Sequence, residues 1–362
     1  MKYLRRLANT NFNMQPINTA LLSFGMSGWV FHAPFITTHK GFRFHSVWER
    51  SKNLAAQKYP GVITYRTLHE LLNDKEVELV IVNTPNFTHF DYAKDALLAG
   101  KHVVVEKPFT TTPREAIELI DLAESQQKVL SVFQNRRYDS DYKTACKIVR
   151  EKLLGKIVEA EFHFDRYKEE LSEKVHKETS GAGTGALYDL GAHLIDQSLQ
   201  LFGIPESIFA DIRIIRPLSK VDDYFEVLLY YPELRVRLHS TYFAREPIPA
   251  FSIHGTKGSF IKSRADVQEE LLQSNEIPGG VSWGKEPAAE MGILHTEKDG
   301  KIVNEKIPSL QGNYGEYYAG IHEAIRDHLT PPVTGADGLN VIRIIEAAYK
   351  SSKERRVVDL DS

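Results

Sequence analysis

The chain has 362 residues, 42% of them hydrophobic and 26% charged, which is typical of a globular protein with room for two domains. Its net charge of -3 supplies no strong positive field, so we expect neither nucleic acid nor a membrane surface as a partner. The single cysteine, Cys146, excludes an internal disulfide and favours a cytoplasmic location. No apolar run reaches the roughly 18 residues that a membrane span requires.

Residues 1–17 are basic but lack the apolar core of a secretory signal, so we expect an extension that need not be ordered. Residues 18–137 then alternate between apolar strand patterns and helical patterns, which predicts a parallel sheet covered by helices on both faces. The strands are expected at 19–24, 42–48, 78–83, 102–106 and 129–133, and the helices at 28–38, 52–59, 67–73, 88–99 and 113–127.

The first strand ends in a phosphate-binding pattern, Ser23-Phe24-Gly25-Met26-Ser27-Gly28, which is G-x-G-x-x-G with serine in the first place. A glycine turn that opens a helix offers free N–H groups to a pyrophosphate. Glu49 ends the second strand, where a carboxylate accepts hydrogen bonds from the adenosine ribose of NAD. Arg50 follows and could instead pair with the 2′-phosphate of NADP. We expect NAD, with NADP left open, against the alternative of two surface charges.

Two further strands end in polar residues at the same sheet edge, where ligands bind in open α/β sheets. One is followed by Asn83-Thr84-Pro85-Asn86 and then His89, the other by Glu106-Lys107-Pro108. A partly desolvated lysine at this edge can take part in proton transfer near neutral pH. The alternatives are a capped helix start and a solvated charged turn.

Residues 138–362 lose this alternation and predict a second α/β domain with a large open, mostly antiparallel sheet. We expect strands at 157–166, 207–216, 222–230, 234–242, 251–254, 259–262 and 357–360, and helices at 185–203, 314–329 and 336–350. Residues 264–291 are expected to form a long loop, of the kind often used as a lid or arm. Trp283 in this loop either covers a pocket or simply packs.

The helix expected at 185–203 places Asp189, His193 and Asp196 on one face. Because a neighbouring carboxylate raises the pKa of an imidazole, we expect His193 to titrate within reach of neutral pH as an acid or base. An ordinary solvated polar face is the alternative. The histidines lack the spacing of a metal site, so no metal is predicted.

These motifs together resemble the Gfo/Idh/MocA oxidoreductase family. The resemblance rests on Glu106-Lys107-Pro108 and on Gly185-x3-Asp189-x3-His193-x2-Asp196, and it extends over nearly the whole chain from about Asn18. The segments from Asn83 to His89 and from Gln134 to Arg137, with Phe164–Tyr167 and Gln197, are similar to the branch of bacterial inositol dehydrogenases. Two departures are Ser23 in the glycine pattern and the absence of tryptophan from residues 175–184.

The resemblance implies a Rossmann domain, a nicotinamide cofactor and oxidation of a secondary alcohol on a cyclic polyol or sugar, with inositol-like substrates favoured. Lys107 would bind the reacting hydroxyl, and the peptide bond before Pro108 is cis in many relatives. His193 would be the acid or base, oriented by Asp189. The alternatives within the family are a redox-assisted glycosidase and a non-catalytic regulator that binds a dinucleotide or sugar.

The resemblance also implies a homodimer or homotetramer that forms through the second sheet.

It further implies more substrate and cofactor contacts than Lys107, Asp189 and His193 alone. Substrate contacts are expected from Lys107, Arg136, Asp165, Arg166, Tyr167, Asp189 and His193, and cofactor contacts from Phe24, Gly25, Met26, Ser27, Gly28, Glu49, Arg50, Asn83, Thr84, Pro85, Asn86, His89, Glu106, Lys107 and Asn135.

Overall fold

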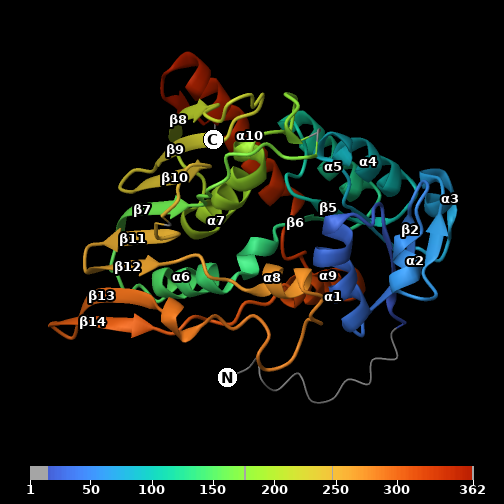
Figure 1. Cartoon of the computed structure of the whole chain (residues 1–362), viewed down its shortest axis with the longest axis horizontal. Helices are drawn as coiled ribbons and strands as arrows, with labels where there is room; N and C mark the ends of the chain where they lie inside the picture. Colours follow the sequence, from blue (N-terminus) through green and yellow to red (C-terminus); the bar gives the residue numbers. More distant parts are fainter. Residues whose placement is uncertain (1–14, 175–176, 247, 361–362) are drawn as a thin grey trace.

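The amino-terminal half forms a six-stranded parallel sheet with helices on both faces, as predicted. A computed structural model describes residues 15–174, 177–246 and 248–360, so the expected extension lies largely outside the described residues (Figure 1). The strand order is β3-β2-β1-β4-β5-β6, with β1 in the centre. The strands are β1 (Ile17–Leu21), β2 (Phe42–Trp48), β3 (Ile63–Tyr65), β4 (Leu79–Val82), β5 (His102–Glu106) and β6 (Leu130–Phe133).

Local signals explain two of the helix starts in this half, those of α3 and α5. Thr67 and Thr112 each accept a hydrogen bond from the backbone N–H of a glutamate three residues later, whose side chain reaches back to close a capping box. The helices are α1 (Ala33–Thr38), α2 (Leu54–Lys58), α3 (Leu68–Asn73), α4 (His89–Leu98) and α5 (Pro113–Ser125), with short turns η1 (Gly28–His32), η2 (Asn86–Thr88) and η3 (Asn135–Tyr138).

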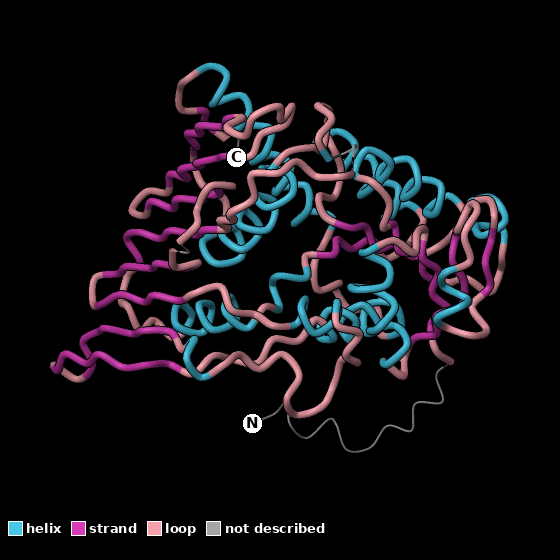
Figure 2. Tube along the Cα trace, in the orientation of Figure 1, coloured by secondary structure: helices cyan, strands magenta, loops and turns pink. Residues whose placement is uncertain are grey.

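The second half forms a nine-stranded sheet whose order is β14-β13-β12-β11-β7-β10-β9-β8-β15. Only β7 and β10 pair in parallel, and the other neighbours are antiparallel. Figure 2 shows helices on the side that faces the first domain and none on the outer side. The strands are β7 (Ile157–His163), β8 (Ser207–Arg213), β9 (Tyr224–Tyr230), β10 (Arg235–Thr241), β11 (Phe251–Gly255), β12 (Gly258–Lys262), β13 (Gly292–Lys298), β14 (Lys301–Ile307) and β15 (Val358–Asp359).

Five elements were not predicted: β3, β13, β14, α6 (Ser140–Arg150) and α8 (Gln268–Gln273). Strand β3 has only three residues, and β13 and β14 have mostly exposed side chains, which weakens the apolar alternation. Helix α6 buries polar side chains such as Asp141 and Thr144, so its inner face does not look apolar in the sequence. The expectation of a structureless 264–291 loop was therefore wrong, because α8 and η6 (Ala288–Glu290) lie within it.

The end of the chain returns to the first domain. Helix α9 (Gly315–Arg326) stacks Tyr318 on Phe35 of α1 with ring centroids 5.4 Å apart. Trp283, only 6% exposed, lies edge-on to the same Phe35 and donates its Nε1–H to Gln268. Trp283 is thus a packing residue at this junction. Helix α10 (Gly335–Glu354) contacts α5 of the first domain and β8 of the second.

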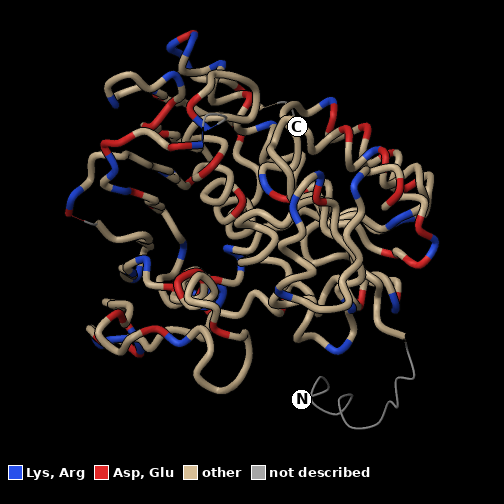
Figure 3. Tube along the Cα trace, turned by 45° about the vertical axis from the view of Figure 1, so that its right-hand side comes forward, with Lys and Arg blue, Asp and Glu red and all other residues tan. Residues whose placement is uncertain are grey.

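The surface carries charges of both signs over both domains, as Figure 3 shows. Within the described ranges, no helix is both long and apolar enough to cross a membrane.

Candidate active site

The glycine pattern forms a tight loop between β1 and η1. The Ser23 hydroxyl accepts a hydrogen bond from the Gly25 N–H at 3.1 Å, and Asn83 donates to the Ser23 carbonyl at 2.8 Å. A Cβ atom on Gly28 would lie 2.4 Å from the Ser23 carbonyl oxygen, so only glycine fits there. The Ser23 side chain therefore stabilises the loop at the position where the G-x-G-x-x-G pattern has glycine.

Glu106 connects this loop to the end of β5. Its carboxylate accepts hydrogen bonds from the Ser27 hydroxyl and the Lys107 N–H, and lies 3.0 Å from His32 Nε2. Burial alone would raise the pKa of Glu106, but His32 and Ser27 outweigh it and hold the pKa below its usual value. A carboxylate is thus fixed at the sheet edge beside the phosphate-binding loop.

Lys107 and Asp189 come together although they are 82 residues apart. Lys107 Nζ donates to the Asp189 carbonyl at 2.7 Å and to Asp189 Oδ1 at 2.8 Å. The Lys107-Pro108 peptide bond is cis, as the resemblance implied. Burial would raise the pKa of Asp189, but Lys107, helped by Lys177, holds it far below its usual range. Lys107 thus meets a fully charged carboxylate.

His193 lies one helical turn beyond Asp189, where η5 (Leu187–Gly191) continues into α7 (Ala192–Phe202). Its side chain is 5% exposed, and its Nδ1 has no hydrogen-bond partner among the described residues. Burial, Lys107 and Arg136 lower the pKa of His193 well below its usual value and outweigh the opposite effect of Asp189. The expectation of a raised pKa was therefore wrong, and His193 is neutral at pH 7.

Asp196 has a different role from the one that its helix face suggested. Both of its oxygens accept hydrogen bonds from Arg137, at 2.8 and 2.6 Å, and its residue exposure is 2%. This pair joins α7 to η3 at the start of the second domain. Asp196 is therefore a buried structural partner of Arg137.

The remaining cofactor candidates include Glu49 and Arg50, which follow β2, and His89, which begins α4. Both oxygens of Glu49 accept backbone N–H groups of α2, from Leu54 and Ala55 at 3.1 Å each, while Arg50 is exposed. His89 is buried, with its ring nitrogens 2.9 Å from the carbonyl oxygens of Thr84 and Pro108, so it joins two strand ends.

Other candidates lie around the same sheet edge. The Asn86 amide donates to the Gly183 carbonyl at 2.6 Å and so joins the two domains. The Phe24 ring packs into the core against Phe44, which leaves only its backbone in the loop, whereas the Met26 side chain is 42% exposed. Pro85 lies between the end of β4 and η2, and Asn135 begins η3 shortly after the end of β6.

Three arginines surround one phenylalanine ring near His193. The guanidinium carbons of Arg136, Arg166 and Arg264 lie 5.0, 5.2 and 4.1 Å from the centre of the Phe164 ring. Arg136 and Arg264 both lower the pKa of His193, which places their charges close to it. Sequence reasoning missed Arg264, because a lone arginine shortly after a strand, here β12, carries no local signal.

Two substrate candidates lie apart from this cluster. The Asp165 carboxylate accepts hydrogen bonds from His239 and from the Thr241 N–H, each at 3.0 Å, on β10. The Tyr167 ring lies under the Arg245 guanidinium at 4.0 Å and is 45% exposed. Among the described residues, neither side chain forms a hydrogen bond, ion pair or ring contact with Lys107, Asp189 or His193.

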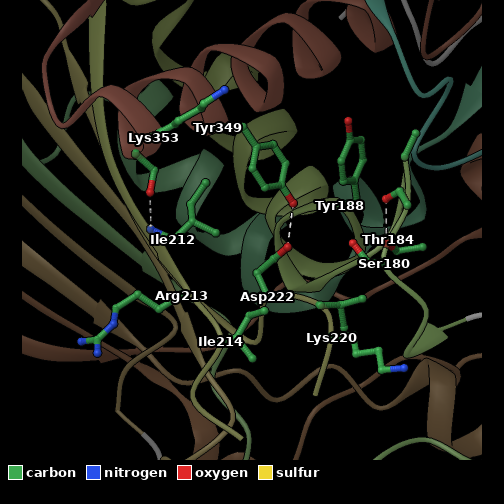
Figure 4. Close-up of a pocket in the computed structure, with 14 residues that line it drawn as sticks. Ser180, Thr184, Tyr188, Ile212, Arg213, Ile214, Lys220, Asp222, Tyr349 and Lys353 are labelled. Carbon is green, nitrogen blue, oxygen red and sulfur yellow. Dashed lines mark hydrogen bonds between the residues drawn. The ribbon is translucent and has the colours of Figure 1, made fainter. Parts of the chain in front are cut away.

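A separate cavity of about 490 Å³ lies beside the start of the helix that carries Asp189 (Figure 4). Asp222 organises it: its oxygens accept from the Tyr349 hydroxyl at 2.7 Å and from the Leu187 N–H at 2.8 Å. Tyr188, next to Asp189 in the chain, forms part of the wall. The cavity therefore borders the helix that carries Asp189, but Lys107 and His193 are not among its lining residues.

Comparisons with known proteins agree with this geometry. A family model described as an oxidoreductase family, NAD-binding Rossmann fold, matches residues 17–134, and its C-terminal alpha/beta domain matches residues 147–360. A Bacillus subtilis protein named scyllo-inositol 2-dehydrogenase (NADP(+)) is 37% identical over 345 residues, which cover 95% of this chain and 96% of that protein.

Solved structures give the same result. The crystal structure of a putative oxidoreductase from Bacteroides fragilis is 46% identical, with a TM-score of 0.88, and the match covers 95% of this chain and all of that one. A putative oxidoreductase from Bacillus subtilis is 37% identical, with a TM-score of 0.91, over 96% of this chain and 99% of that one. The chain therefore belongs to the Gfo/Idh/MocA family of oxidoreductases, and its first half is that family's NAD-binding Rossmann domain.

Proposed function

We propose that this oxidoreductase transfers a hydride between a nicotinamide cofactor and a secondary alcohol of a cyclic polyol or sugar. The observation that carries the proposal is the fixed Lys107 ammonium at the sheet edge. It has three N–H donors, and two of them go to the Asp189 carbonyl and carboxylate. The third remains for the oxygen of a substrate, at the edge where open α/β sheets bind ligands.

The proton of the reacting hydroxyl goes to His193 in this proposal. Because burial and nearby cations keep the imidazole neutral, it is ready to accept a proton at pH 7. Its Nδ1 is buried, so Nε2 is the atom that receives the proton. Lys107 meanwhile donates a hydrogen bond to the oxygen as negative charge develops there. Asp189 positions Lys107.

The dinucleotide fits the residues of the first domain. The Gly28 position has no room for a side chain, and Asn83 Oδ1 is buried without a hydrogen-bond partner among the described residues. When bound, the nicotinamide supplies the hydride acceptor or donor. The chain's own contribution is the loop from Ser23 to Gly28 and Glu106, which accepts a hydrogen bond from the Ser27 hydroxyl.

The choice between NAD and NADP depends on Glu49 and Arg50. Each oxygen of Glu49 already holds a backbone N–H group of α2, which weakens the repulsion of a 2′-phosphate by this carboxylate. Arg50 is exposed beside it and can pair with a phosphate. We therefore propose that the protein accepts both dinucleotides. Arg50→Ala should lower kcat/KM for NADP about tenfold or more while changing that for NAD little.

The substrate would be recognised through hydrogen bonds to several hydroxyl groups. Arg136, Arg166 and Arg264 provide such donors around Phe164, so an inositol-like ring is the first substrate to test. The similarity to a scyllo-inositol 2-dehydrogenase supports the same choice.

The test measures reduced nicotinamide formed from scyllo-inositol with NAD and with NADP, in the parent protein and in Lys107→Met. Turnover in the parent and its loss in the variant would support the proposal. Dinucleotide binding without turnover on inositols, sugars or their keto forms would overturn it. Release of a sugar from a glycoside without net reduction of NAD would identify a redox-assisted glycosidase instead.

A further inference from the structure

The outer face of the nine-stranded sheet carries a second cluster of polar groups, on the strands β7 and β10 that lie side by side in Figure 1. The parallel register places His163 directly opposite His239. Their chain neighbours Phe162 and Leu238 are fully buried on the helix-covered face, so the two histidines project from the other face. Asp165, two residues beyond His163, has its carboxylate beside both rings.

The distances within this cluster are those of atoms arranged around one ion. His239 Nδ1 lies 3.0 Å from Asp165 Oδ1, and His163 Nδ1 lies 3.3 Å from Asp165 Oδ2. One nitrogen or oxygen atom from each of the three residues lies within 4.8 Å of the others. Around tetrahedral zinc, with bonds of about 2.0–2.1 Å, neighbouring ligand atoms are separated by about 3.4 Å.

A simple hydrogen-bonded bridge does not explain the whole cluster. It accounts for the contact between His239 and Asp165. His163 Nδ1 and Asp165 Oδ2, however, are both buried and have no hydrogen-bond partner within the described part of the chain, although they are 3.3 Å apart. Two buried atoms that are in contact without hydrogen-bond geometry can instead both bind one cation that lies beside them.

The surroundings suit a positive ion. Glu161 lies 3.5 Å from His163 Nε2, on the side of the ring away from Asp165. Glu161 and Glu226 share Arg237 as a cationic partner, while Asp165 contacts only the two histidines and the Thr241 N–H among the described residues. The Thr241 N–H holds Asp165 Oδ1 at 3.0 Å, as outer hydrogen bonds commonly hold metal ligands.

The side-chain exposures indicate a site that is formed before an ion arrives. They are 11% for His163, 5% for Asp165 and 18% for His239, so the ligand atoms are largely shielded. Imidazole nitrogens with one carboxylate favour zinc and similar transition metals over magnesium or calcium, which take oxygen ligands.

We propose that His163, Asp165 and His239 bind one divalent transition-metal ion, preferentially Zn²⁺, with a water molecule in the fourth position. The ion joins the end of β7 to β10, next to Arg166, which points toward the cluster around Phe164. It is a structural ion and takes no part in hydride transfer, because His193 lies on a helix of the opposite face. The inference therefore stands independently of the proposed catalytic function.

The test titrates Zn²⁺, Co²⁺ and Mg²⁺ into the chelator-treated full-length protein by calorimetry. We expect one Zn²⁺ per chain, a rise in Tm on zinc binding, the visible absorption of four-coordinate Co²⁺, and no binding of Mg²⁺ at the same concentrations. Asp165→Asn and His239→Gln should each weaken zinc binding at least about tenfold. Far-UV circular dichroism establishes that both variants are folded.

A matched control is His45→Gln, which removes a histidine paired with one carboxylate, Asp74, at 2.7 Å in the first domain. This variant should bind zinc like the parent. The proposal is overturned if no stoichiometric zinc binding occurs, or if Asp165→Asn and His239→Gln bind zinc as tightly as His45→Gln does.

Discussion

Replacing Lys107 with methionine is the most direct perturbation of the candidate active site. The side chain keeps its length and loses its ammonium, and with it the bonds to the Asp189 carbonyl at 2.7 Å and to Oδ1 at 2.8 Å. The N–H group proposed for the substrate is lost as well. A positioned proton-transfer or hydrogen-bonding group contributes about 10²–10⁴ in rate, which is about 3–5 kcal/mol of transition-state stabilisation.

The loss of stability should be much smaller than this loss of rate. The Asp189 side chain is 37% exposed, so water can replace part of the lost bonding, and we expect a cost of about 1–2 kcal/mol. A domain stable by about 5 kcal/mol or more would remain over nine-tenths folded after that loss. A fall of decades in turnover therefore cannot come from unfolding.

A second consequence separates the chemistry of Lys107 from simple damage to the site. Lys107 is one of the charges that hold the pKa of His193 low. Removing it should raise that pKa, so the acid limb of the kcat/KM profile should move to higher pH. The assay follows reduced nicotinamide at saturating dinucleotide across the pH range, and the dinucleotide Kd should stay close to that of the parent.

Lys101→Met provides the control, because this lysine is also buried and bound to main-chain carbonyls. Its Nζ donates to Asp74 at 2.6 Å and to Val77 at 2.9 Å, and the residue is 5% exposed. This variant should lose stability but keep its turnover per folded molecule. The reasoning is refuted if Lys107→Met retains turnover within about tenfold of the parent, or if its acid limb does not move.

Three other measurements address the helix that carries the site. Gly185→Ala should lower the free energy of unfolding by more than about 2 kcal/mol, because Gly185 has φ +100° and its Cβ would lie 2.0 Å from Asp222 Oδ1. The control is Gly61→Ala, because Gly61 has φ +95° but its added Cβ would have no atom within 4 Å. This variant should lose only about 1–2 kcal/mol of unfolding free energy, measured in urea, and equal losses in the two variants would contradict the clash at Gly185. Asp196→Asn removes the nearest carboxylate from the buried Arg137, which keeps only the more distant Asp337 at 3.7 Å, and should cost about 3 kcal/mol while kcat per folded molecule is retained. A stable variant with low kcat would contradict the structural role. In the parent, His193 must be neutral to accept a proton, and its pKa is lowered from 6.5. The kcat/KM for alcohol oxidation should therefore fall only below about pH 6.5. A fall that begins above that pH would contradict the lowered pKa.

Much of the first domain follows from local patterns. Val103 to Val105 form a fully apolar run that could only be a buried strand, and Thr112 with Glu115 encodes a capping box. Such signals act within a few residues, and the structure keeps them. The short strand β3, the edge strand β14 and its neighbour β13 were missed because their sequences carry little apolar alternation of their own.

The candidate site was only partly predictable. The motifs around Lys107 and around Asp189 and His193 were enough to suggest an oxidoreductase through their resemblance to a known family, since such motifs are local in sequence. The helix face grouped Asp196 with them, yet Asp196 is held by Arg137. The pKa of His193 was predicted with the wrong sign, because Asp189 is a local neighbour whereas Arg136 and complete burial are not.

The sequence by itself thus indicated most of the elements of the first domain and which chemical groups lie at their ends. The tertiary structure decided which group meets which: Asp189 meets Lys107 rather than His193, and Asp165 meets two histidines of the outer sheet face rather than the substrate candidates. The physical reason is that propensity and periodicity act over one or two turns of chain, whereas desolvation and charge pairing depend on every residue that folding brings near.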